Sequence, residues 1–197
     1  MATEIDITFG PVAQALRELQ IRFYVCGSVA SSAHGEMRAT ADIDVVAELQ
    51  KEQVAQFIQL LGETFYADEV SMKEAIARRS SFNLIHQGTF IKVDIFAPKD
   101  REYDQQVLER CTVEKLGLDD DSIEAPVSQP EDIVLAKLEW YRIGGETSDR
   151  QWRDILGVLK MQCFDIDIDY MQKWAPEIGV ADLLERALDE SGLAEAQ

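Results

Sequence analysis

The sequence predicts an α+β protein, in which helices flank a mixed β-sheet and a helical part follows at the C-terminal end. Three observations predict this fold. Short apolar runs typical of strands alternate with helical spacing early in the chain, only helical patterns follow later, and 197 residues suit one compact domain, or one small domain with an appendage. We therefore expect a domain over residues 1–125 and a helical region over residues 126–197 that packs on it.

In the first 125 residues, each predicted element follows from the spacing of its apolar residues. The apolar run at residues 22–26 leads into Gly27-Ser28, which is typical of a strand that enters a tight turn. Residues 82–86 and 90–96 are strand-like runs separated by Gln-Gly-Thr, which favours a β-hairpin. The other expected elements are helices over 11–19, 29–34, 51–61 and 103–110, a strand over 42–47 and short β pieces between 112 and 126.

Helix start and stop signals divide the C-terminal part. Ser128-Gln-Pro-Glu131 fits a capping box, in which the first and last residues cap each other's backbone. The helix that follows is expected to end at Gly144-Gly145, since glycine favours a C-cap. Ser148 is expected to start the next helix in the same manner, and two further helices are predicted over 167–174 and 180–188.

The composition narrows the classes of function. The chain has 37 acidic and 19 basic residues, a net charge of −18, which is poorly suited to holding a long polyphosphate backbone. No apolar stretch approaches the length of about 18 residues that a membrane-spanning helix needs, and the acidic start lacks the features of a signal peptide. Three cysteines without a CxxC pair disfavour a zinc site or a disulfide framework, so a reducing cytoplasm is the expected setting.

Asp42 and Asp44 are the first candidates for chemistry. On a strand, residues i and i+2 point to the same face, so the two carboxylates are expected side by side. Two adjacent negative charges repel, and a bound cation relieves that repulsion. Mg²⁺ is bound through a few carboxylates together with substrate phosphates, which such a pair could supply. The alternative is a solvent-exposed strand edge that carries acidic residues and no ligand.

Asp94 lies in the middle of an otherwise apolar strand, between Val93 and Ile95. Aspartate is depleted in strands, so its place there calls for an explanation. If this strand pairs beside residues 42–47, three carboxylates converge and could hold two divalent ions about 3.5–4 Å apart, the arrangement used for in-line displacement at phosphorus. The alternative is an ion pair between Asp94 and Lys92.

Four residues near these strands could contact phosphate. Gly27 allows close approach of the backbone, and Ser28 offers an N–H group and a hydroxyl. Arg38 could bind triphosphate oxygens through its fork of donors, and Thr40 lies near it, just before the Asp pair. A strand–Gly–Ser–helix turn is also common in proteins without such a site, and Arg38 could instead balance the charge of the neighbouring aspartates.

The order Gly27-Ser28, thirteen further residues, Asp42-Ile-Asp44 and Val93-Asp94-Ile95 resembles the DNA polymerase beta-type nucleotidyltransferase superfamily. The resemblance covers residues 20–97. It implies a palm-like mixed sheet, a Gly-Ser turn that binds phosphate, and three aspartates that bind metal ions, Mg²⁺ or Mn²⁺. Each motif is short, and it is their order and strand contexts that make the combination specific.

The C-terminal part is similar to AbiEii-type and minimal nucleotidyltransferases of prokaryotic toxin–antitoxin and phage-defence systems. The matching segments are Leu135-Ala-Lys-Leu138 and Arg153-Asp-Ile155. The resemblance implies that Lys137 contacts the triphosphate, and that Asp154 holds Lys137 or acts as a base. The alternative is that both residues are simply solvated on amphipathic helices.

Together, these patterns predict a cytoplasmic, Mg²⁺-dependent nucleotidyltransferase. A hydroxyl of an acceptor would attack the α-phosphorus of a nucleoside triphosphate, with ATP the expected one, and pyrophosphate would leave. The acceptor could be a small molecule, a protein or an RNA end, and the acidic chain favours a cationic acceptor over RNA. Two alternatives stay open: a module that keeps the fold without turnover, and a toxin–antitoxin or defence component that acts mainly by binding a partner protein.

Overall fold

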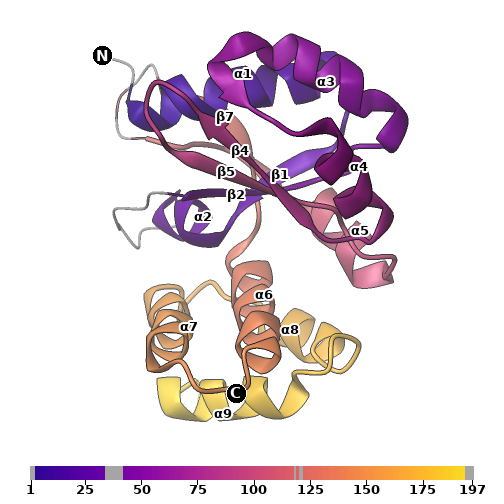
Figure 1. Ribbon diagram of the computed structural model, residues 1–197. Coiled ribbons are helices and arrows are strands. Elements are labelled where there is room, and N and C mark those ends of the chain that lie inside the picture. Colours follow the sequence, from indigo (N-terminus) through magenta and orange to yellow (C-terminus); the bar gives the residue numbers. More distant parts are fainter. Residues whose placement is uncertain (1–2, 34–41, 118, 120–121, 194–197) are drawn as a thin grey trace.

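A mixed β-sheet lies at the centre of the N-terminal part (Figure 1). The computed structural model describes residues 3–33, 42–117, 119 and 122–193. In this part of the chain, the sheet has seven strands in the order β3-β4-β5-β2-β1-β7-β6. The strands are β1 (Phe23–Cys26), β2 (Asp42–Ala47), β3 (Phe65–Tyr66), β4 (Ser81–His86), β5 (Lys92–Phe96), β6 (Thr112–Lys115) and β7 (Glu124–Val127).

The central strands β2 and β5 run parallel, and Asp44 lies directly opposite Asp94. Strand β1 pairs antiparallel with β2 and parallel with β7, while β4 pairs antiparallel with β5. Two predictions are therefore confirmed: the hairpin formed by residues 82–86 and 90–96, and the placement of the Asp94 strand beside the Asp42 strand.

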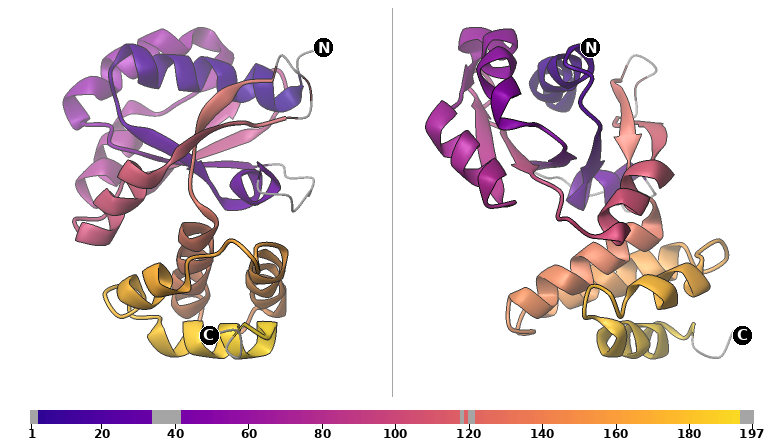
Figure 2. Two further views of the ribbon diagram at one scale, coloured as in Figure 1. Left: turned by 180° about the vertical axis from the view of Figure 1, so that it is seen from behind. Right: turned by 90° about the vertical axis from the view of Figure 1, so that its right-hand side faces the viewer.

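Helices lie on both sides of this sheet. They are α1 (Glu4–Glu18), α2 (Gly27–Ala33), α3 (Val54–Leu61), α4 (Glu69–Ala77), α5 (Glu102–Arg110), α6 (Pro130–Ile143), α7 (Asp149–Met161), α8 (Ile168–Trp174) and α9 (Ala181–Ser191), with 3₁₀ turns at Lys51–Gln53 and Gly62–Thr64. Helices α1 and α3 pack together over one face, whereas α2 and α6 to α9 lie on the opposite side (Figures 1 and 2). Buried Ile43 and Val45 face the first side, so Asp42 and Asp44 face the second.

Helix α1 begins earlier than the sequence pattern indicates, at Glu4 and not at Pro11. Thr3 and Asp6 form a capping box, in which Asp6 Oδ2 accepts from the Thr3 N–H at 2.7 Å and Thr3 Oγ1 accepts from the Asp6 N–H at 3.2 Å. Pro11 therefore lies inside the helix, where proline costs about 3 kcal/mol. Full burial of Phe9 and Val12 on either side of it offsets that cost.

Two elements near residue 70 were not predicted. Helix α4 buries Met72 and few other side chains, so its sequence carries only a weak apolar stripe. Its start is defined by Asp68, whose Oδ1 accepts from the Ser71 N–H at 2.7 Å. Strand β3 has two residues and is therefore too short to give a periodic pattern.

The predicted capping box at the start of α6 is wrong. The helix begins at Pro130 with Gln129 as the N-cap, and proline suits the first helical position because it needs no N–H partner. Ser128 instead continues the sheet, since its N–H donates to the carbonyl oxygen of Val25 at 3.1 Å. The Glu131 carboxylate pairs with Arg110 at 3.1 Å instead of capping the helix.

The other C-terminal predictions hold. Helix α6 ends at Ile143 with Gly144 as its C-cap, and Ser148 caps α7 by accepting from the Gln151 N–H at 3.3 Å. Helices α8 and α9 occupy the two further predicted positions. Strand β7 extends to Val127, and the buried core includes residues from both the sheet and these helices, so the division at 125/126 stays a prediction. None of the helices in the described segments is long and apolar enough to cross a lipid bilayer.

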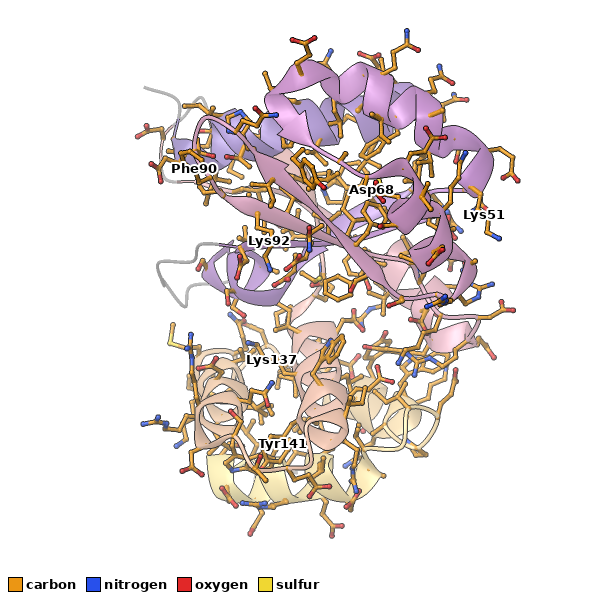
Figure 3. The ribbon with its side chains drawn as sticks, in the orientation of Figure 1. Lys51, Asp68, Phe90, Lys92, Lys137 and Tyr141 are labelled. Atoms are coloured by element: carbon orange, nitrogen blue, oxygen red, sulfur yellow. The ribbon has the colours of Figure 1, made fainter. Side chains whose placement is uncertain are left out.

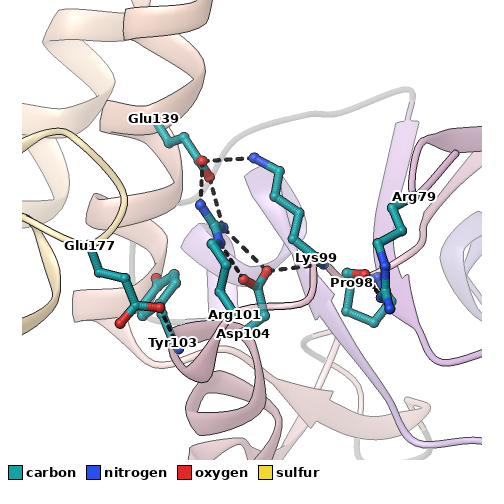
Figure 4. A network of polar contacts seen from close by, with 8 residues as sticks. All are labelled: Arg79, Pro98, Lys99, Arg101, Tyr103, Asp104, Glu139 and Glu177. Atoms are coloured by element: carbon teal, nitrogen blue, oxygen red, sulfur yellow. Dashed lines mark hydrogen bonds and ion pairs between the residues drawn. The ribbon is translucent and has the colours of Figure 1, made fainter.

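A network of charged side chains ties α6 to the loop after β5 (Figure 4). Glu139 of α6 accepts from Lys99 Nζ and from Arg101 Nη1, each at 2.7 Å, and Arg101 also pairs with Asp104 at 2.6 Å. The Arg101 and Glu139 side chains are only 21% and 17% exposed, so this pair is shielded from solvent more than a surface ion pair. The network therefore fixes α6 relative to the strand that carries Asp94.

Candidate functional site

Three carboxylates lie on the sheet face that turns towards α2 and α6. Asp42 and Asp44 alternate with buried residues along β2, and Asp94 is paired in register with Asp44 across the parallel β2–β5 ladder. Phe96, on the same face of β5, packs its ring against Trp140 of α6 at a centroid distance of 5.9 Å. Trp140 therefore brings α6 against the sheet face that carries the carboxylates.

Gly27 lies against the Asp44 carboxylate. Its φ of +64° falls in the left-handed region that favours glycine, and a Cβ at this position would come 2.0 Å from Asp44 Oδ2. Gly27 is the first residue of α2, followed by half-buried Ser28, whose carbonyl oxygen accepts from Ser32 Oγ at 3.0 Å. The Gly27-Ser28 turn is thus placed directly beside the carboxylates.

The negative charge of the carboxylate face shifts the pKa of Asp44. Burial, followed by repulsion from the Asp94 and Asp42 carboxylates, raises the pKa of Asp44 to about 6. Lys92 and Lys137 act in the opposite direction. The carboxylates therefore lie close enough to interact, and a cation near them is favoured.

Lys92 supplies such a cation. The Lys92 side chain is labelled in Figure 3. Its Nζ lies 2.7 Å from Asp94 Oδ2 and 3.6 Å from Asp42 Oδ1, so the ion pair that is the alternative explanation for Asp94 is formed. The ammonium group acts as a stand-in ion, because it shows that Asp42 and Asp94 can both approach one cation. Their oxygens are the hard ligands that Mg²⁺ takes in proteins. Within the described segments, however, no three His, Cys, Asp or Glu side chains are already gathered as a metal-binding group.

Lys137 and Asp154 come from neighbouring helices, α6 and α7. Lys137 Nζ lies 4.0 Å from Asp154 Oδ2, and the two side chains are 20% and 22% exposed. The Lys137 side chain is labelled in Figure 3. Burial raises the pKa of both Asp44 and Cys26, and the Lys137 ammonium acts against that rise, so it lies within electrostatic reach of both residues. The structure thus brings Lys137 near both Asp154 and the carboxylate face. Arg38 and Thr40 lie outside the described residues.

Several residues beside the aspartates were not predicted as part of the site. The sequence indicated Lys92 only as a possible ion-pair partner of Asp94, although its spacing of two residues from Asp94 places it on the same face of the strand. Asn83 of β4 lies opposite Asp94, and Cys26 of β1 lies opposite Asp44, so four strands contribute polar side chains to one row. Strand register across the sheet carries no local sequence signal, so the positions of Asn83 and Cys26 in this row could not be predicted.

A separate cavity of about 320 Å³ lies in the helical part, between α8 and α9. Ala175, Leu184 and Leu188 are among its lining residues, which are mostly apolar. It lies away from the carboxylates, and its lining is not suited to phosphate. The carboxylate face, and not this cavity, is therefore the candidate functional site.

Comparison with known proteins gives a likeness of fold. No protein-family description matches the chain, and neither does any curated protein sequence. The chain is similar in structure to an antigenic nucleotidyltransferase-like protein from Paracoccidioides brasiliensis, with a TM-score of 0.63 and 18% identity over 98% of this chain and 93% of that one. It is also similar to the antibiotic-resistance factor ANT(2'')-Ia, with a TM-score of 0.51 and 13% identity over 98% and 96% of the two chains. With its mixed sheet and flanking helices, the chain has a nucleotidyltransferase fold.

Proposed function

We propose that this chain is a Mg²⁺-dependent nucleotidyltransferase, which moves a nucleoside monophosphate from a triphosphate, ATP in the first instance, to a hydroxyl of an acceptor. One observation carries the proposal. Asp44 and Asp94 lie opposite each other on parallel strands, and the backbone of Gly27 lies against the Asp44 carboxylate. A carboxylate cluster beside a Gly-Ser turn combines ligands for a divalent ion with donors for phosphate.

The donor set suits a hard divalent cation. Asp42, Asp44 and Asp94 would hold it through carboxylate oxygens, and the position of Lys92 supports this because two of the three already share one cation. Bound Mg²⁺ would neutralise charge on the triphosphate and on the departing pyrophosphate.

The chain's own residues then bind and orient the reactants. The backbone N–H groups of Gly27 and Ser28 and the Ser28 hydroxyl bind phosphate oxygens beside Asp44, while the Lys137 ammonium, held by Asp154, binds them from the α6 side. Asp94 accepts the proton of the acceptor hydroxyl. The hydroxyl oxygen bonds to the α-phosphorus, and the bond from that phosphorus to pyrophosphate breaks in line. Positioning and charge neutralisation supply most of the rate acceleration.

The acceptor is proposed to be cationic or neutral. The net charge of −18 repels a polyanion such as RNA and attracts a cation, so a positively charged small molecule or protein segment suits the chain better.

Transfer of label tests the proposal and identifies both substrates. The protein is incubated with Mg²⁺, a cell lysate and each α-labelled triphosphate in turn, beside the variants Asp44→Asn and Asp169→Asn. Asp169 is exposed on α8, so its variant makes the same chemical change away from the sheet. The wild type and Asp169→Asn should label one acceptor. Asp44→Asn should transfer less than about one hundredth as much label to that acceptor. Equal labelling by all three proteins, or no Mg²⁺-dependent labelling at all, would reject the proposal.

A further inference from the structure

Lys92 lies between two of the three carboxylates. Its Nζ is 2.7 Å from Asp94 Oδ2 and 3.6 Å from Asp42 Oδ1. The Lys92 ammonium therefore already neutralises part of the negative charge of these carboxylates.

The sheet register fixes this arrangement. Lys92 lies directly opposite Asp42 across the β2–β5 ladder and two residues before Asp94 on its own strand. All three side chains therefore point to the same face, and neighbouring strands are only about 4.8 Å apart. The Lys92 ammonium has both carboxylates within reach wherever this part of the sheet is intact.

The Lys92 side chain can also move away from the carboxylates into solvent. Its side chain is 37% exposed, and the Asp42 and Asp94 side chains are 51% and 20% exposed, so water can reach the ammonium group and replace its ion pairs. Lysine carries its charge on a flexible stem of four carbons, which allows the ammonium to move while the backbone stays in place.

We propose that Lys92 is a positioning residue that holds Asp42 and Asp94 as their internal cation until a divalent metal ion displaces it. The inference rests on the proposed function, because it takes the same carboxylates as the metal ligands. An ammonium and a divalent ion cannot share this position, since two cations within a few ångströms repel strongly. Metal binding is therefore coupled to release of Lys92, and the free protein binds metal more weakly than its carboxylates alone would.

Manganese titrations of the full chain test this coupling without nucleotide or turnover. Calorimetry would compare the wild type with Lys92→Met, Lys92→Arg, Lys137→Met and Lys73→Met. Lys73 pairs with Glu69 on the exposed surface of α4, so Lys73→Met removes the same charge far from the site. Lys92→Met should bind Mn²⁺ about tenfold more tightly than the wild type, since the competing cation is gone. Lys92→Arg keeps a cation and should stay close to the wild type, as should Lys73→Met.

Lys137→Met separates displacement from general electrostatics. Lys137 also favours the charged form of Asp44, yet it pairs with Asp154. Displacement therefore predicts a smaller gain in Mn²⁺ affinity for Lys137→Met than for Lys92→Met. Melting in chelator gives a second readout: Lys92→Met should melt below Lys73→Met, because its carboxylates have lost their counter-ion, and added Mn²⁺ should reverse that order.

The outcomes distinguish this inference from the proposed function. If the wild type binds Mn²⁺ and Lys92→Met binds it no more tightly, the displacement of Lys92 is wrong and the proposed function stands. An equal gain for Lys137→Met would overturn the inference in the same way. Absence of Mn²⁺ binding in every variant would overturn both.

Discussion

Gly27 and Asp44 are in such close contact that no other residue fits at position 27 without moving the carboxylate: a Cβ there would come 2.0 Å from Asp44 Oδ2. The contact joins the start of α2 to the middle of β2. Because both residues belong to the proposed site, the packing of a turn and the position of a metal ligand depend on each other.

Gly27→Ala should therefore lose function as well as stability. The φ of +64° and the clash with Asp44 together should cost about 1–3 kcal/mol of unfolding free energy, and the shifted carboxylate should abolish metal-induced stabilisation. Gly179→Ala is the matched control, since Gly179 has φ +73° with nothing within 4 Å of an added Cβ. Denaturant titrations with Mg²⁺ or chelator compare the two. A full Mg²⁺ response in Gly27→Ala would show that the Asp44 position is not critical.

Asp44→Asn should keep the fold and lose the response to metal. In chelator, the variant should be as stable as the wild type or up to about 1 kcal/mol more stable, because repulsion from Asp94 and Asp42 is removed. Thermal melts with Mn²⁺ and with chelator provide the measurement. Destabilisation in chelator by more than about 2 kcal/mol would indicate a structural role for this carboxylate instead.

Asp132 should make stability depend on pH. Its side chain is buried, Tyr170 donates to Oδ1 at 2.8 Å, and Arg110 lies 3.4 Å from Oδ2. Burial raises the pKa of Asp132 from its ordinary 3.8 to about 6, against the effects of Tyr170 and Arg110. Between these two values the folded state binds more protons than the unfolded state, so this group's contribution to stability rises as pH falls from about 7 to 4.

Comparison with Asp132→Asn isolates that contribution, because the amide does not titrate. The wild type should gain about 1–3 kcal/mol relative to Asp132→Asn when urea unfolding is measured at pH 4.5 instead of 7.5. A stability difference that stays constant between the two pH values would mean that Asp132 ionises at the same pH in both states.

Lys137→Ala tests whether the helical part belongs to the site. A lost charge-assisted contact to phosphate is worth about 1.5–3 kcal/mol, or roughly ten- to a hundredfold in affinity. Calorimetric titration of a non-hydrolysable ATP analogue with Mg²⁺ should show that loss, while Mn²⁺ binding without nucleotide survives. Equal dissociation constants for Lys137→Ala and the wild type would confine the site to the sheet and α2.

The sequence predicted the parts of the fold that have local signals. Apolar alternation marked β2, β4 and β5, and the strand-centred Asp94 indicated which strands meet. The parallel pairing of β1 with β7 joins Val25 to Val127, about a hundred residues apart, and no local pattern specifies such a contact. The start of α6 was misplaced because Ser128 satisfies the backbone of Val25 instead of capping the helix.

The candidate site, too, was only partly predictable from the sequence. Strand alternation predicted that Asp42 and Asp44 share a face, and the pairing of β2 with β5 places Asp94 directly opposite Asp44. The bridging position of Lys92 depends on strand register and on the rotamer of a long side chain, neither of which the sequence states. The contact between Gly27 and Asp44 likewise depends on a backbone turn and on β1–β2 pairing acting together.

The most direct test of the account is a crystal structure of the protein with Mn²⁺ and a non-hydrolysable ATP analogue, using anomalous diffraction to locate the metal. We expect anomalous peaks within coordination distance of the Asp42, Asp44 and Asp94 carboxylates. The triphosphate should lie against Gly27-Ser28, and the Lys92 ammonium should be withdrawn from Asp94. Manganese bound elsewhere, or a triphosphate held away from this face with the Lys92–Asp94 ion pair intact, would contradict it.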